Sequence, residues 1–180
     1  MQYQCRVSVI DKKVFPDLQE RYLNDPKAGA CPFYHVGDTF LFKRYGGEDT
    51  FWTMGKGSHC AEAWDAISRY IYTALQGGSI MRGWTHDEHM MIACCNDGTR
   101  PVIFKIERLD YKVLVLSENP EEVIKCEVKQ ALESLDRVNR VEFHENPGWI
   151  EVFCDRNDPP HDEELLDALS SSNLEIVRID

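Results

Sequence analysis

Basic residues are scarce in this sequence, which has 20 Lys and Arg residues against 31 Asp and Glu residues and a formal net charge of -11. A surface of this sign repels phosphate backbones, and no local run of basic residues offsets it. We therefore expect no nucleic-acid partner, and we attribute most of the acidity to a solvated surface.

Long hydrophobic runs are also missing, because no segment reaches the roughly 20 consecutive apolar residues that a membrane helix needs. The first residues, MQYQCRVSVI, lack the basic region, the apolar stretch and the small-residue cleavage site of a signal peptide. These absences predict a cytoplasmic protein that has no membrane partner.

Cysteine pairs of the C-x-x-C type are absent, although the chain has seven cysteines. In a reducing cytoplasm we expect these residues to be thiols or metal ligands and not disulfides. They are Cys5, Cys31, Cys60, Cys94, Cys95, Cys126 and Cys154. Without close pairs, spacing alone does not identify a zinc site of the finger type.

The character of the chain changes near residues 108–112. Five of the seven cysteines and most of the Trp and Gly residues precede this point, and regular strand-like and helix-like segments follow it. The sequence therefore predicts an α+β protein of two domains. A cysteine-bearing α+β domain occupies residues 1–109 and a second domain occupies residues 110–180.

The second domain has the pattern of a ferredoxin-like βαββαβ fold. Its predicted strands are 111–116, 139–145, 149–155 and 174–180, and its helices lie within 117–135 and 158–172. Asn119 is the expected N-cap of the first helix, with Pro120 at its first position. The first strand-to-helix loop has no thiol, which excludes a metallochaperone of this fold. We expect an interaction domain, with a homodimer through its sheet as a hypothesis.

The first domain combines strands with long irregular stretches. Strands are expected at 3–10 and 39–45, a short helix at 15–23, and irregular chain at 24–38 and 46–58. Residues 59–78 form the clearest helix, capped by Ser58 and stopped at Gly77-Gly78. A hairpin around Asp97-Gly98 closes the domain.

The hairpin places two adjacent cysteines on opposite faces of a strand, so Cys94 and Cys95 cannot both reach one metal without a bulge. A two-residue turn at Asp97-Gly98 pairs Cys95 with Arg100, on the apolar face. The guanidinium beside this sulfur would favour its thiolate form. Cys95 and Arg100 are therefore candidate site residues.

Two further cysteines, Cys60 and Cys31, occupy positions that are typical of reactive or metal-binding thiols. Cys60 falls in the first turn of its helix, where unpaired backbone N–H groups favour an anion, so it is a candidate nucleophile. Cys31 lies within the irregular stretch at 24–38, and functional residues often lie in such loops. The histidines that could complete a tetrahedral ligand set are more simply explained as solvated polar residues; they are His35, His59, His86 and His89.

Three ordered motifs carry a family resemblance: CPFYHVGDTF at 31–40, CAEAWDAI at 60–67 and CCNDGTRPVIFKIER at 94–108. Through them, residues 3–108 resemble a family of short, uncharacterised prokaryotic proteins. The chain has GKGSH where that family has Pro-x-Gly-Phe, and typical members end before the second domain. The family has no assigned activity, so the resemblance marks signature residues without giving them roles. They are Cys31, Asp38, Cys60, Trp64, Cys94, Cys95, Asp97, Gly98 and Arg100.

Three functions remain open on this basis. The first is a binding or interaction protein whose cysteines pack in the core. The second is a zinc or iron–sulfur protein that uses Cys31, Cys60 and Cys95, with Cys94 as a further candidate ligand. The third is an enzyme with Cys60 as its nucleophile and a histidine as base.

Overall fold

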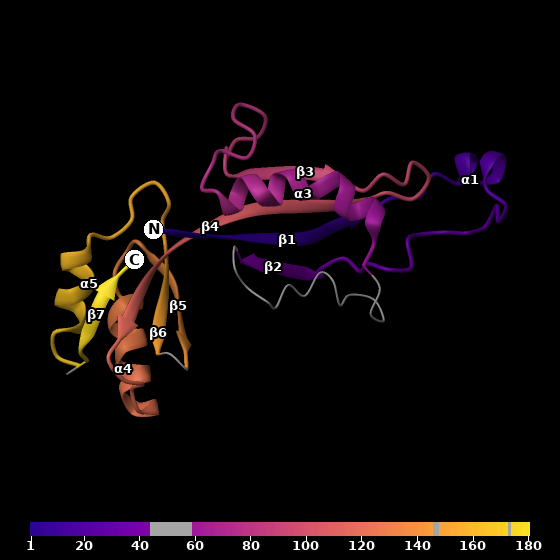
Figure 1. Cartoon of the computed structure of the whole chain (residues 1–180). Coiled ribbons are helices and arrows are strands. Elements are labelled where there is room, and N and C mark those ends of the chain that lie inside the picture. Colours follow the sequence, from indigo (N-terminus) through magenta and orange to yellow (C-terminus); the bar gives the residue numbers. More distant parts are fainter. Residues whose placement is uncertain (44–58, 146–147, 173) are drawn as a thin grey trace. The chain divides into compact units, whose positions relative to one another are not determined.

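The computed structural model describes residues 1–43, 59–145, 148–172 and 174–180 (Figure 1). The predicted irregular stretch at 46–58 and the predicted cap Ser58 lie outside these residues. Contacts divide the chain into two compact units. The first unit comprises residues 3–108, and the second comprises residues 109–180 together with residues 1–2.

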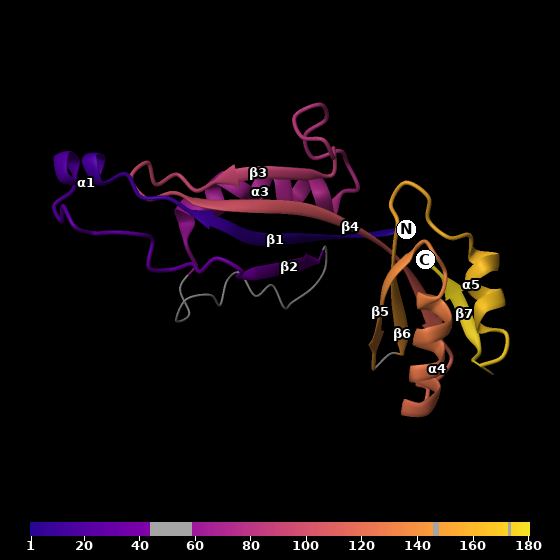
Figure 2. The same ribbon diagram turned by 180° about the vertical axis from the view of Figure 1, so that it is seen from behind.

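Antiparallel strands and one long helix build the first unit. Its strands are β1 (Gln2–Lys12), β2 (Thr39–Lys43), β3 (Met90–Cys94) and the first part of β4 (Val102–Leu116). Its helices are α1 (Pro16–Tyr22) and α3 (Ala61–Leu75). β1 pairs with β2, β4 lies next to β1, and β3 pairs with β4. α3 covers one face of this sheet, as Figure 1 and the reverse view in Figure 2 show.

The core of the first unit lies between α3 and the sheet because both elements present an apolar side. Alternate strand residues turn inward, among them Val7, Phe42 and Phe104. Ile67 and Ile71 of α3, one helical turn apart, meet them. The helix ends at Leu75, before the predicted stop, where Gly77 adopts a φ of 75° that favours glycine.

The hairpin register differs from the prediction. Ala93 pairs with Phe104, and the backbone N–H of Cys95 donates to the carbonyl of Val102, so Cys95 does not face Arg100. The carboxylate of Asp97 accepts backbone N–H bonds from Thr99 and Arg100 and closes a wider turn. Pro101 has no N–H group and cannot donate to the ladder, so regular pairing begins one residue later.

The second unit is a four-stranded antiparallel sheet with two helices. Its elements after β4 are α4 (Glu122–Glu133), β5 (Val138–His144), β6 (Trp149–Cys154), α5 (Asp162–Leu169) and β7 (Ile176–Ile179). The strand order is β5-β6-β4-β7. Val128, Leu132, Leu165 and Leu169 of the helices pack against strand residues to form its core. Both units therefore mix helices with antiparallel sheet, as an α+β protein does.

The predicted N-cap of α4 is wrong. Glu121 has extended dihedral angles (φ -64°, ψ 156°) and is the N-cap, so the helix begins after Pro120. The side chain of Asn119 instead lies against Gly148, where an added Cβ would come within 2.2 Å of its Oδ1. The sequence Asn-Pro-Gly at 146–148, a hairpin signal between the predicted strands 139–145 and 149–155, falls partly outside the described residues. The strands on either side pair from His144 to Trp149.

In the part of the chain that the structure describes, no helix combines the length and the apolar character needed to cross a bilayer.

Candidate functional site

Three of the predicted ligand cysteines come together in the first unit, although they come from three different elements. Cys31 lies in the loop between α1 and β2, Cys60 is the N-cap of α3, and Cys95 follows β3. None of them is in a disulfide. All three pack in the same apolar core as the ring of Tyr34. We call Cys31, Cys60 and Cys95 around Tyr34 the thiol cluster.

Tyr34 packs in the same core as the three thiols and has only 2% of its surface exposed. Burial raises the pKa of its hydroxyl far above the ordinary value, and the neighbouring Cys60, Cys31 and Cys95 thiols raise this pKa further. The hydroxyl also forms a hydrogen bond with the thiol of Cys60. Because Tyr34 keeps its proton, its O–H group is available as a donor to sulfur.

The loop that carries Cys31 and Tyr34 is held from the neighbouring strand. Lys12 Nζ donates to the carbonyl oxygen of Cys31 at 2.6 Å and to that of Tyr34 at 2.7 Å. The carboxylate of Asp38 accepts the backbone N–H of His35 at 2.7 Å and so forms a side-chain turn before β2. These bonds fix an otherwise irregular segment, which a binding site on a loop requires.

The α1 side of the same loop is also anchored. The amide of Gln19 donates to the carbonyl of Gly29 at 2.9 Å and accepts the N–H of Gly29 at 3.0 Å. Gln19 is almost fully buried, so these two bonds satisfy both ends of a polar side chain inside the protein. The loop is therefore held before and after Cys31.

Cys95 is 8% exposed, and two backbone groups point at its sulfur. The Sγ atom accepts the N–H of Val102 at 3.3 Å and a second backbone N–H from Asp97. Burial nevertheless raises the pKa of this thiol. Arg100 does not assist, because its Nε donates to Asp97 Oδ2 at 3.1 Å, so the predicted pairing of Arg100 with Cys95 is wrong.

Cys94 differs from the residues of the thiol cluster because it lies at the surface. Its side chain is exposed and lines a groove of about 400 Å³ between α3 and β3, where Arg69 and Tyr70 form the helical wall. Cys95 also borders this groove. Cys94 is therefore accessible to solvent in a groove that Cys95 also borders.

The sulfurs of the thiol cluster are set wider than the ligands of a single zinc ion. A tetrahedral zinc with bonds of about 2.3 Å holds its sulfurs about 3.8 Å from one another. Among the described residues, the group whose ligand atoms all lie within 4.8 Å of one another consists of Glu142, His144 and Glu151, in the second unit. The three thiols do not meet that spacing.

Two of the histidines considered as ligands, His35 and His89, form ion pairs with nearby carboxylates. His35 Nδ1 lies 3.8 Å from Asp38, and His89 Nδ1 lies 3.4 Å from Asp87. Each pair belongs to a single loop, as expected for polar loop residues. Lys12 and Tyr34 were not predicted from the sequence, in which a strand lysine and a loop tyrosine have no distinguishing pattern.

No family model, no curated protein and no solved structure matches this chain. The resemblance of its three cysteine motifs to an uncharacterised prokaryotic family stays a prediction. The function therefore has to be inferred from the geometry of the residues themselves.

Proposed function

We propose that the first unit binds a thiophilic metal centre through Cys31, Cys60 and Cys95. The observation that carries this proposal is that three thiols from separate elements pack in one core beside Tyr34. Sulfur ligands suit zinc and iron–sulfur clusters. The spacing of the thiols favours a polynuclear iron–sulfur cluster, because its thiolates bind different iron atoms and stand further apart than the ligands of one ion.

Hydrogen bonds to sulfur support a ligand role over a packing role. A cysteine that only fills space needs no donors, whereas N–H and O–H bonds stabilise the negative charge of a bound thiolate. Cys95 accepts two backbone N–H groups, and Cys60 has the Tyr34 hydroxyl. Three protein thiolates leave one position for a further ligand.

A second candidate function is nucleophilic chemistry at Cys60. Its place as the N-cap of the 15-residue helix α3 and its bond with the Tyr34 hydroxyl favour this alternative. The two functions differ in reactivity, because a metal-bound sulfur is protected from alkylation and a free nucleophile is modified quickly.

The second unit serves association in this proposal. Its βαββαβ order and its strand order β5-β6-β4-β7 agree with a ferredoxin-like domain, whose outer strands can pair with a second copy. We propose a cytoplasmic homodimer that acts on no nucleic acid. Gel filtration at low micromolar concentration tests the dimer, and a mass of one chain at every concentration contradicts it.

Purification without oxygen, followed by metal analysis and a visible spectrum, tests the metal centre. We expect iron with sulfide and a brown protein; about one equivalent of zinc would contradict the polynuclear cluster, because the thiols are set wider than the ligands of one ion. Cys31→Ser, Cys60→Ser and Cys95→Ser should each lower the metal content.

The matched control is Cys126→Ser, because Cys126 is exposed on α4 in the second unit. Metal-free protein in which Cys31, Cys60 and Cys95 react with iodoacetamide only after unfolding would contradict both chemical functions. Selective alkylation of Cys60 in metal-free protein would favour the nucleophile.

A further inference from the structure

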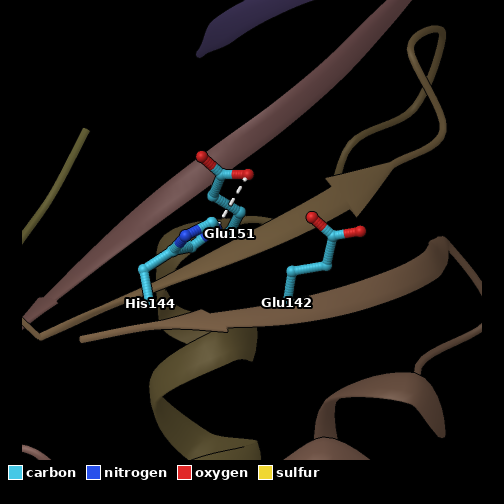
Figure 3. A group of neighbouring side chains, drawn as sticks. All are labelled: Glu142, His144 and Glu151. Atoms are coloured by element: carbon cyan, nitrogen blue, oxygen red, sulfur yellow. Dashed lines mark ion pairs between the residues drawn. The ribbon is translucent and has the colours of Figure 1, made fainter. Parts of the chain in front are cut away.

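Two adjacent strands of the second unit bring three ionisable side chains together on one face (Figure 3). Glu142 of β5 is the direct cross-strand partner of Glu151 of β6, and His144 lies two residues beyond Glu142. Side chains alternate along a strand, so Glu142 and His144 share a face. Val141 and Ile150 point the other way, into the core below α4 and α5.

The ligand atoms of these residues already lie close together. One oxygen of each glutamate and one ring nitrogen of His144 all lie within 4.8 Å of one another. Bonds of about 2.1 Å to one metal ion would place neighbouring ligand atoms roughly 3 to 3.5 Å apart. Small side-chain rotations suffice to close this difference. We call Glu142, His144 and Glu151 the hairpin site.

The charges of the hairpin site favour a cation. Two carboxylates directly opposite one another on a sheet repel, and the side chain of Glu151 is only 5% exposed. Arg140 Nε lies 3.2 Å from Glu142 Oε1, and its guanidinium stacks over Phe153 at 4.1 Å, so one positive charge already compensates Glu142. A carboxylate has a second oxygen, which remains for a metal.

His144 supplies an independent observation. Its Nε2 atom is buried and makes no hydrogen bond, although Glu151 Oε2 lies 3.2 Å away. The two atoms form an ion pair that is not aligned as a hydrogen bond, and a metal ion at this point would bind both the nitrogen and the carboxylate oxygen. The imidazole ring stacks on Trp149 with centroids 4.9 Å apart and an interplanar angle of 13°, which fixes its orientation.

We propose that Glu142, His144 and Glu151 bind a divalent ion of the first transition row. Two carboxylates and an imidazole suit Mn²⁺ and Zn²⁺, whereas calcium and magnesium prefer all-oxygen sites. Three protein ligands leave positions for water, so the site has the ligand number of an open metal centre. This proposal does not depend on the thiol cluster, which lies in the other unit.

Mn²⁺ is the appropriate probe because it prefers oxygen and nitrogen ligands to thiolates. Titration of the full chain with MnCl₂, followed by electron paramagnetic resonance of the free ion, should give one bound equivalent. ZnCl₂ should displace it, because zinc stands above manganese in the affinity order of divalent ions. His144→Gln and Glu151→Gln should each weaken Mn²⁺ binding by at least tenfold.

Glu145→Gln is the matched control, because Glu145 follows β5 directly but is exposed and pairs with Lys125 at 2.7 Å. Its affinity for Mn²⁺ should equal that of the unchanged protein. Circular dichroism establishes that each variant is folded, and Glu142→Gln replaces Glu151→Gln if the buried change prevents folding. Binding that is absent, or equally strong in His144→Gln, overturns the proposal.

Discussion

The thiol cluster takes its three sulfurs from a loop, a helix N-cap and the end of a strand, whereas the hairpin site takes its ligands from two paired strands. The first arrangement brings together residues far apart in the sequence and depends on the packing of a whole unit. The second depends only on the register of one hairpin. We therefore expect changes in the core to affect the thiol cluster more strongly than the hairpin site.

Phe104→Ala should have the largest effect. Phe104 is fully buried and meets the ring of Tyr34 edge-to-face at 5.3 Å, so its removal leaves a cavity beneath the thiol cluster. We expect a loss of about 3–5 kcal/mol in the free energy of unfolding of the first unit, measured with urea. The metal content of the first unit should fall, and the Mn²⁺ affinity of the hairpin site should not change.

Phe104→Leu, a milder change, keeps this test informative if the alanine variant unfolds. Equal loss of Mn²⁺ binding in either folded variant would mean that the two sites are not separate.

Each unit buries a thiol in its core, and this gives a pH dependence of stability. Burial raises the pKa of Cys154 to about 11, and its Sγ donates to the carbonyl of Val152 in the neutral form. The thiol ionises at lower pH in the unfolded chain, so stability is present below about pH 9 and is lost between about pH 9 and 11. The slope from one such group reaches about 1.4 kcal/mol per pH unit.

Urea unfolding at pH 8, 9 and 10 measures this slope for the second unit, and Cys154→Ala should reduce it. Burial also raises the pKa of Cys5 in the first unit, so Cys5→Ala should flatten the corresponding slope there. Stability of the second unit that does not change between pH 8 and 10 would contradict a buried neutral Cys154.

Part of this arrangement could be predicted from the sequence, because local periodicity determined it. The helix predicted at 59–78 corresponds to α3, and its apolar residues Ile67 and Ile71 recur one turn apart on the buried face. Strand alternation predicted that Cys94 and Cys95 lie on opposite faces with Cys95 on the apolar one, and Cys95 is buried whereas Cys94 is exposed. The grouping of Cys31, Cys60 and Cys95 as candidate ligands stays a prediction, although all three pack in the core of the first unit.

The remaining features depend on contacts that periodicity does not contain. The wider turn after Cys95 follows from bonds to the side chain of Asp97, and Asp-Gly alone favours a tighter turn. The position of Tyr34 depends on a long-range hydrogen bond from Lys12 to its carbonyl oxygen, which the sequence does not show. In the sequence, Glu142 and Glu151 are ordinary polar residues of two predicted strands. Only the strand register shows that they lie opposite one another.

Tyr34→Phe should have a smaller effect on stability and a clear effect on the thiols. The change removes one hydroxyl and its bond with Cys60, so we expect a loss of about 0.5–1.5 kcal/mol in the free energy of unfolding. Iodoacetamide labelling with mass spectrometry should show a changed rate at Cys60. Tyr72→Phe is the control, because Tyr72 is exposed on α3, and an identical labelling rate in both variants would contradict the hydrogen bond.

Arg100→Ala should have the smallest effect. Arg100 pairs with Asp97 at 3.1 Å in a partly exposed turn, so the expected loss is at most about 1 kcal/mol. The alkylation rate of Cys95 should remain the same, because the guanidinium does not contact that sulfur. A large change in this rate would restore the two-residue turn that pairs Arg100 with Cys95.

X-ray absorption at the metal edge of protein purified without oxygen tests the central claim most directly. Ligation by Cys31, Cys60 and Cys95 predicts sulfur neighbours at about 2.3 Å from the metal. These neighbours should be reduced in number by Cys60→Ser and unchanged by Cys126→Ser. A metal surrounded only by oxygen and nitrogen, or protein with no metal in the first unit, would contradict the thiol cluster as a metal centre.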